Sequence, residues 1–172
     1  MRLLFTFIII GTSLATGYCQ TANEYYQRAK SKAEIQDYRG AIADLSKVIE
    51  LDPDGNTYYN RGVLKRKLQD HRGAIVDFSK AIELGELGPN NTDAYCGRGH
   101  SKSVLQDYRG AIADLSKAIE LGLSGPLLGQ TYYDRALAKL MLKQKDSGCL
   151  DLSKAGELGY GKAFDIIRKH CN

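Results

Sequence analysis

The sequence lacks the short motifs that mark common catalytic sites. It contains no HExxH zinc-protease motif, no GxSxG nucleophile motif, no phosphate-binding loop and no glycine-rich dinucleotide fingerprint. Its three histidines and four cysteines are too few and too scattered to show zinc-site spacing. Its many carboxylates fall mainly at repeated positions, which gives them a structural explanation. We therefore expect no enzyme, with no catalytic residue, no metal site and no cofactor.

Long runs of basic or apolar residues are also missing. Lys and Arg number 24 and Asp and Glu number 20, but the two signs are interspersed, as they are on solvated helix faces. A nucleic-acid partner is therefore not expected. The longest apolar run, near the N-terminus, falls short of the roughly 20 residues that a membrane-spanning helix needs. We expect no membrane span.

That N-terminal run has the layout of a secretory signal peptide. Arg2 is followed by the almost unbroken apolar segment Leu3–Ile10 and then by small and polar residues. Cleavage after Cys19 fits the small residues at the peptidase positions, and cleavage after Ala15 stays open as an alternative. We expect residues 1–19 to be removed and the mature chain to be exported, to a periplasm or outside the cell.

An internal repeat dominates the rest of the chain. The twelve residues QDYRGAIADLSK occur identically at 36–47 and 106–117, and a third copy at 69–80 differs at three positions. A fourth, more divergent copy ends at Lys154. Successive equivalent aspartates are 33, 37 and 37 residues apart; they are Asp44, Asp77, Asp114 and Asp151. This period suits two helices and two connections, so we predict stacked helical units.

The second unit shows the predicted local structure. A helix begins near Tyr58 and is interrupted at Asp70–Gly73. Apolar residues then recur at helical spacing until Gly85, which tolerates the left-handed conformation that ends many helices; they are Ala74, Ile75, Phe78, Ala81 and Ile82. Each unit is therefore predicted to be a helical hairpin.

The spacing of aromatic and small residues resembles the tetratricopeptide-repeat family. That family places an aromatic, a Gly or Ala, an Ala, an aromatic or Leu, and an Ala at fixed positions, here Tyr58, Gly62, Ala74, Phe78 and Ala81. The usual period of that family is about 34 residues. Because two of the periods here are longer, a relation to the Sel1-like repeats stays open as an alternative. The resemblance implies an all-α, right-handed α-solenoid across residues 23–172. It would comprise four hairpins at about 23–55, 56–92, 93–129 and 130–160, with a capping helix at 161–172.

One arginine and one aspartate recur in every unit, always 16 residues apart. The arginines are Arg28, Arg61, Arg98 and Arg135, and their partners are the four repeated aspartates named above. We favour an ion pair inside each hairpin, because a residue required by the repeat itself is the same in every copy. The alternative is a stripe of arginines that binds a ligand.

The resemblance also implies a function. In this family the first helices line a concave face that receives peptides or partner helices, and small exported bacterial proteins of this kind are similar to this chain. Carried over by position, the candidate groove residues are Tyr26, Lys30, Tyr59, Asn60, Arg66, Lys67, His100 and Tyr133. The family's carboxylate clamp is not expected, because Asp93 and Gly97 stand where it needs basic residues.

These features predict a non-enzymatic scaffold that binds a protein or peptide. Two alternatives stay open. The chain could be an accessory structural subunit of an envelope complex whose groove is empty, or a Sel1-like protein that acts on cell-wall material.

A disulfide is predicted at the C-terminal end. Cys149 and Cys171 are each 11 residues from Tyr160, which lies in the predicted turn between the last two helices. Antiparallel packing of those helices places the two cysteines side by side, and an exported chain would meet oxidising conditions. The alternative is a pair of buried thiols. Cys96 is the unpaired cysteine and a possible groove residue.

Overall fold

The computed structural model describes residues 21–85 and 90–171, and this part of the chain consists of helices, turns and short connections without strands. The predicted signal peptide lies outside the described residues. A helix over residues 21–34 comes first. It is followed by α2 (Tyr38–Leu51), α3 (Gly55–Lys67), α4 (His71–Leu84), α5 (Asn90–Val104), α6 (Tyr108–Glu120), α7 (Pro126–Met141), α8 (Lys145–Glu157) and α9 (Lys162–His170). None of the described helices is long and apolar enough to cross a membrane.

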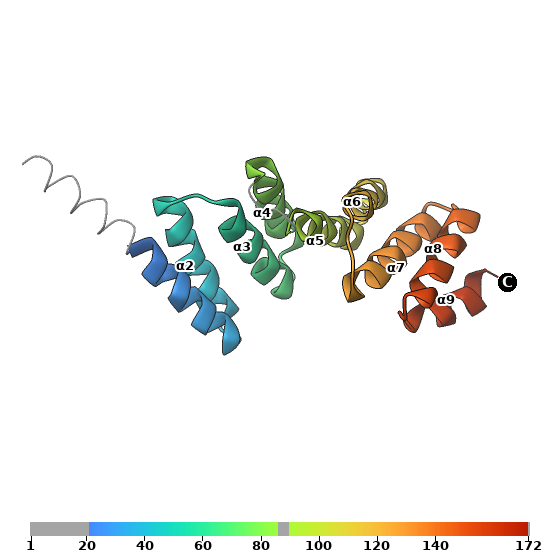
Figure 1. Cartoon of the computed structure of the whole chain (residues 1–172), viewed down its shortest axis with the longest axis horizontal. Coiled ribbons are helices and arrows are strands. Elements are labelled where there is room, and N and C mark those ends of the chain that lie inside the picture. The colour runs from blue at the N-terminus through green and yellow to red at the C-terminus, as the bar shows by residue number, and fades with distance from the viewer. Residues whose placement is uncertain (1–20, 86–89, 172) are drawn as a thin grey trace, which may run out of the picture.

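The helices form antiparallel hairpins that follow one another along a single direction (Figure 1). Helix α3 packs on α4, α5 on α6 and α7 on α8, and the first helix of each pair also packs on the second helix of the preceding pair. The helix over residues 21–34 and α9 lie at opposite ends of this array. The predicted all-α solenoid is confirmed.

The turn inside each hairpin has a repeated geometry. The residue two positions before the second helix is in a left-handed conformation without being glycine, with φ between 60° and 65°, at Gln36, Gln69, Gln106 and Lys143. In the first three hairpins an aspartate follows and caps the second helix. In α4, for example, the Asp70 side chain accepts a hydrogen bond from the Gly73 amide. A Cβ on Gly73 would lie 2.1 Å from the Asp70 carboxylate, so a larger residue there would make the carboxylate shift.

This cap corrects the predicted break at Asp70–Gly73. The break is shorter than the sequence suggested, because α4 already begins at His71 and Gly73 belongs to its first turn. A capping carboxylate satisfies helix amides that would otherwise lack a partner, which lets the helix begin directly after the turn. The fourth hairpin has Gln144 at the equivalent place, without a side-chain cap.

The core is a row of small clusters, one in each hairpin. Each second helix buries one large apolar residue; these residues are Leu45, Phe78, Leu115 and Leu152, and all are at most 3% exposed. Phe78 is the largest, and its ring also reaches the next hairpin. A Cβ on Gly97 would lie only 2.6 Å from the Phe78 ring. The equivalent positions of the neighbouring hairpins carry Asn60 and Asp134, so glycine at 97 makes room for phenylalanine at 78.

Helix α9 closes the C-terminal end. It buries Ala163 completely against a cluster that includes Leu152 and Ala155. Phe164, the next residue, is 54% exposed. The structure joins Cys149 of α8 to Cys171 at the end of α9, with the Sγ atoms 1.97 Å apart and the Cα atoms 5.7 Å apart. This Cα separation lies within the range that disulfides span, about 4.4–6.8 Å.

The fit between Phe78 and Gly97 can be tested by mutation. We expect Gly97→Ala to lower the free energy of unfolding by about 1–3 kcal/mol, since the added methyl group overpacks the site. In a Phe78→Leu background the same change should cost at least about 0.5 kcal/mol less, because leucine does not reach so far. Chemical denaturation of the four variants measures both values.

Gly161→Ala is the control for this experiment. A Cβ at Gly161 meets no atom within 4 Å and its φ of −55° suits alanine, so the expected change is within about 0.5 kcal/mol. An equal cost of Gly97→Ala in the parent chain and in the Phe78→Leu background would show that the ring does not impose the glycine.

Candidate functional site

The first cavity lies between the first two hairpins, on the surface lined by the helix over residues 21–34 and by α3; we call it the N-terminal cavity. Its volume is about 270 Å³, and three predicted groove residues line it: Tyr26, Lys30 and Asn60. Asn60 Nδ2 donates a hydrogen bond of 3.1 Å to the Tyr26 hydroxyl, which fixes both side chains. Its remaining walls are apolar, from Ala29, Ala33, Leu45, Val63 and Leu64. An apolar pocket with a few fixed polar groups is typical of a binding site.

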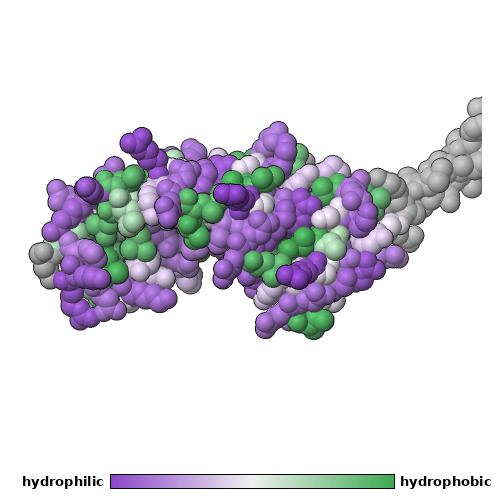
Figure 2. Space-filling model, turned by 180° about the vertical axis from the view of Figure 1, so that it is seen from behind, coloured by the Kyte–Doolittle hydropathy of each residue, from purple (hydrophilic) through white to green (hydrophobic). Residues whose placement is uncertain are grey.

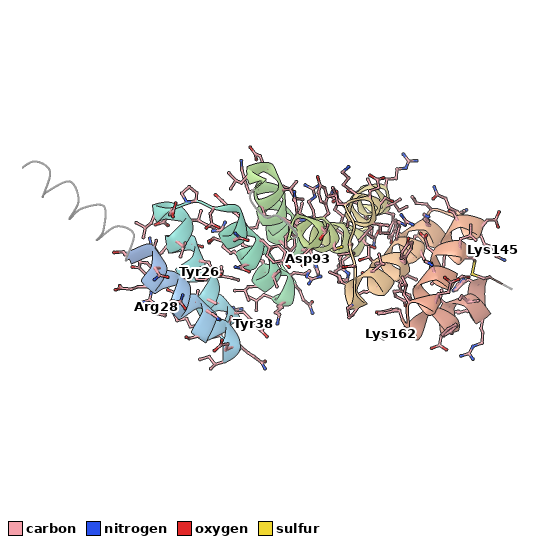
Figure 3. The ribbon with its side chains drawn as sticks, viewed as in Figure 1. Tyr26, Arg28, Tyr38, Asp93, Lys145 and Lys162 are labelled. Atoms are coloured by element: carbon pink, nitrogen blue, oxygen red, sulfur yellow. A yellow bond between two sulfur atoms is a disulfide. The ribbon has the colours of Figure 1, made fainter. Side chains whose placement is uncertain are left out.

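A second, smaller cavity lies farther along the same surface, between α3, α5 and α7; we call it the central cavity. It holds about 50 Å³ and contains three more predicted residues: Tyr59, Arg66 and His100. Three further polar residues, which are not among the eight candidates, also line it: Asp93, Gln130 and Asp134. Figure 3 labels Tyr26 in the first hairpin and Asp93 near the middle of the array.

The central cavity has a distinct electrostatic character. His100 Nδ1 lies 3.2 Å from Asp134 Oδ2, and the His71 ring is 6.4 Å from the His100 ring. Burial, together with the nearby His100, lowers the pKa of His71. Burial also raises the pKa of Asp93. The cavity therefore combines carboxylates, imidazoles and the Arg66 guanidinium in a half-buried space that favours polar recognition.

Two predicted groove residues lie outside both cavities. Lys67 Nζ is 5.0 Å from the centre of the Tyr38 ring and 3.5 Å from its hydroxyl, so this lysine covers a neighbouring tyrosine. The Tyr133 ring packs 5.0 Å from the Tyr160 ring in the C-terminal cluster. The structure thus brings six of the eight candidates into two cavities and gives the other two packing partners.

Cys96 lines the central cavity but is not suited to be a nucleophile. Cys96 is 6% exposed, and its Sγ lies 3.3 Å from Thr131 Oγ1. Burial raises the pKa of the Cys96 thiol to about 11. Because the thiolate is the reactive form, a thiol with this pKa is largely inert at neutral pH.

A third cavity contains none of the eight candidates; we call it the C-terminal cavity. Its volume is about 540 Å³, and it is lined by Ser103, Tyr108, Leu137, Leu140, Met141, Lys145, Ile166 and His170. These residues come from α5 to α9. The apolar end of α7 is a local signal for it in the sequence, and Met141 there is 61% exposed.

The repeated arginines are engaged inside the fold. Arg61 Nε and Nη2 donate to the two carboxylate oxygens of Asp77 at 2.9 and 2.8 Å, and Lys65 Nζ lies 2.8 Å from the same carboxylate. Arg61 also donates to Ser46 Oγ of the preceding hairpin at 3.0 Å, and its guanidinium lies over the Tyr58 ring.

The other hairpins repeat this arrangement. The arginine–aspartate pairs are Arg28–Asp44, Arg98–Asp114 and Arg135–Asp151. Hydrogen bonds from Arg28 and Lys32 lower the pKa of Asp44 to about 2. The structure therefore supports the ion-pair hypothesis for the repeated charges over the ligand stripe.

The chemistry of the described surface favours binding. Within residues 21–85 and 90–171, no three or more His, Cys, Asp or Glu side chains come close enough to hold a metal ion. What these residues do form is a series of cavities with fixed polar groups along one face.

This architecture is that of a tetratricopeptide-repeat solenoid. The sequence model of the tetratricopeptide repeat matches residues 24–54 and 55–84, which are the first two hairpins. No curated protein is significantly similar in sequence.

Solved structures share the fold. A MamA protein superposes with a TM-score of 0.76 at 22% identity, over 84% of this chain and 78% of the other. YrrB, described as a tetratricopeptide-repeat protein with an unusual peptide-binding site, superposes with a TM-score of 0.71 at 19% identity, over 91% of this chain and 81% of YrrB. The first tetratricopeptide-repeat domain of Spaghetti (RPAP3), bound to the HSP90 peptide SRMEEVD, superposes with a TM-score of 0.64 at 22% identity. This match covers 72% of this chain and 94% of the other.

A double-mutant cycle tests the role of the repeated ion pair. The Asp77 side chain is 1% exposed and that of Arg61 is 16% exposed. We expect Asp77→Ala to cost about 3–5 kcal/mol of unfolding free energy, because it leaves Arg61 and Lys65 without their buried carboxylate. Arg61→Ala should cost less, because Lys65 still pairs with Asp77. The coupling energy of the two substitutions should exceed about 1 kcal/mol.

The exposed pair Lys80–Glu83 in the same hairpin is the control. Its coupling should not exceed about 0.5 kcal/mol. If the Arg61–Asp77 cycle gave no more coupling than this surface pair, the arginines would be free for a ligand after all.

Proposed function

We propose that this chain is an exported, non-enzymatic module that binds a segment of a partner protein along the surface lined by its first helices. The observation that carries the proposal is that six independently selected residues line two cavities on that surface. Two proteins of the same fold support it: the RPAP3 domain is bound to a peptide, and YrrB is described by its peptide-binding site.

The two cavities suit different parts of one extended segment. The N-terminal cavity would take an apolar side chain, with the exposed Lys30 and the fixed Asn60 available to a carboxylate or a peptide group. The central cavity would bind polar groups through Arg66, His100 and the two aspartates. Apolar anchoring beside positioned polar groups is how small binding surfaces gain most of their affinity.

The face shown in Figure 2 is consistent with localised anchoring. Seen from behind, hydrophobic residues form separate patches between hydrophilic ones (Figure 2). On this side there is no continuous apolar face, so discrete pockets are the better candidates for recognition.

Charge reversal in the two cavities tests the binding surface. Peptides selected from a random displayed library on the parent chain should bind Lys30→Glu/Arg66→Glu at least about tenfold more weakly, a loss of about 1.4 kcal/mol. The control Lys47→Glu/Lys80→Glu reverses two exposed lysines on the second helices and should bind like the parent. Fluorescence anisotropy measures the affinities.

Thermal unfolding must accompany these measurements to show that both double variants remain folded. Unchanged affinity of Lys30→Glu/Arg66→Glu would move the site to the second helices or the loops. That result would favour an accessory subunit that docks through another face.

Export can be tested separately. We expect the chain recovered outside the cytoplasm to begin at Gln20, because residues 1–19 have the layout of a signal peptide. Interrupting the apolar segment with Ile9→Asp should keep the chain inside the cell. N-terminal sequencing of the exported fraction decides the first point, and an exported chain that still begins with Met1 would contradict it.

A further inference from the structure

The C-terminal cavity is the largest of the three cavities, and the proposed function does not use it. Its floor is apolar and comes from two helices, through Leu137, Leu140 and Met141 of α7 and Ile166 of α9. Tyr108, at the start of α6, adds an aromatic wall. Met141 is 61% exposed, so this surface is open to a partner.

The rim of this cavity is basic. Lys145 and His170 line it, and no Asp or Glu does. Lys169 lies on the same side of α9, three residues after Ile166. Several lysines of these hairpins are in ion pairs, as in Lys139–Asp151 and Lys154–Glu157. Lys145 and Lys169 have no ion-pair partner among the described residues, which leaves a positive field beside an apolar floor.

One wall of the cavity depends on the disulfide. Helix α9 has nine residues, and a helix this short is marginal without tertiary support. It buries Ala163 but leaves Phe164 half exposed. The bond from Cys149 holds Cys171, the residue at the C-terminal end of α9 and adjacent to His170. Figure 3 shows this bond at the C-terminal end of the array, near Lys145.

We propose that the C-terminal cavity is a second anchor for the partner segment, selective for an apolar side chain flanked by carboxylates, and that the Cys149–Cys171 disulfide switches it on. The proposal rests on the proposed function, because α5 and α7 also line the central cavity. Charge complementarity specifies the partner: the basic rim attracts carboxylates and repels lysine or arginine. The apolar floor stabilises the complex by removing hydrocarbon from water.

Reduction would remove the anchor. A dithiol reductant would supply two electrons and two protons, so that the S–S bond breaks, Cys149 and Cys171 become thiols and the reductant becomes a disulfide. The last turn of α9 would then lose its covalent tether. Ile166 and His170 would no longer be held against α7, and the cavity would lose a wall.

Three capped, fluorescein-labelled peptides test the site. The first carries two leucines between glutamates, the second has lysines in place of the glutamates, and the third has serines in place of the leucines. With the oxidised chain, we expect the first peptide to bind at least about tenfold more tightly than either twin. Cys149→Ser/Cys171→Ser should weaken its binding by a similar factor. A thiol titration of the unfolded, unreduced chain without residues 1–19 should find only Cys96.

A second variant keeps the test valid if loss of the disulfide unfolds the end of the chain. Lys145→Glu leaves the disulfide in place and should weaken binding of the acidic peptide while improving binding of the lysine twin. Lys117→Glu, an equal charge change at an exposed site on α6, should change neither. Equal binding by the oxidised chain and the cysteine variant would overturn the switch.

Other outcomes separate this inference from the proposed function. If Lys30→Glu/Arg66→Glu abolishes binding of library-selected peptides while the acidic peptide shows no preference over its twins, only the second anchor is wrong. If the oxidised chain self-associates, and Lys145→Glu abolishes this without affecting the peptides, the occupant is a second copy of the chain.

Discussion

The buried aspartate of each hairpin is the constraint on which the array depends. Its carboxylate accepts two hydrogen bonds from an arginine and lies next to a lysine one turn farther along the same first helix. A carboxylate that is 1% exposed, as in Asp77, would be costly without those partners. The pair therefore fixes how far the two helices of a hairpin are displaced relative to each other.

The same arginine connects successive hairpins. In the second, third and fourth hairpins its remaining Nη1 donates to a serine of the preceding second helix, at 3.0 to 3.1 Å. The first arginine, Arg28, has no such bond in the described part of the chain, and its side chain is 56% exposed. One side chain thus sets both the geometry within a hairpin and the stacking between hairpins. This explains why arginine, aspartate and serine recur while other positions vary.

The parts of the structure that follow from repetition were predictable from sequence. Equal 16-residue spacing is enough to place Arg61 opposite Asp77, and equal distance from Tyr160 is enough to place Cys149 beside Cys171. What depends on neighbours in space was not predictable. The position of Lys67 in its repeat assigns it to the groove, but its side chain instead packs over the ring of Tyr38 in the adjacent hairpin. Tyr133 likewise packs against Tyr160, and the whole of α8 separates these two residues in the sequence.

The C-terminal cavity shows the same limit. Its residues lie between positions 103 and 170 and meet only because α9 packs on α8, where its side chains also reach α7. The left-handed turn residues were also hidden, since Gln36 and its equivalents are not glycine. Their conformation closes the first helix through backbone hydrogen bonds, such as Asp37 N to Lys32 O and Gln144 N to Lys139 O. Periodicity therefore gives the scaffold, while the cavities depend on departures from periodicity.

Those departures are where a repeated scaffold can acquire specificity. The repeated residues are used in ion pairs and cores, and the three cavities are lined mainly by positions that differ between copies, such as Lys30, Arg66, Asp93 and Met141. The change of Leu to Phe at 78 illustrates how one departure requires another, because it needs glycine at 97 in the next hairpin. Gly97 in turn leaves α5 without a side chain in the wall of the central cavity, where Asp134 and Asp93 supply the charge. The packing of one hairpin thus shapes the binding chemistry of the next, so the core and the proposed site could not have varied independently.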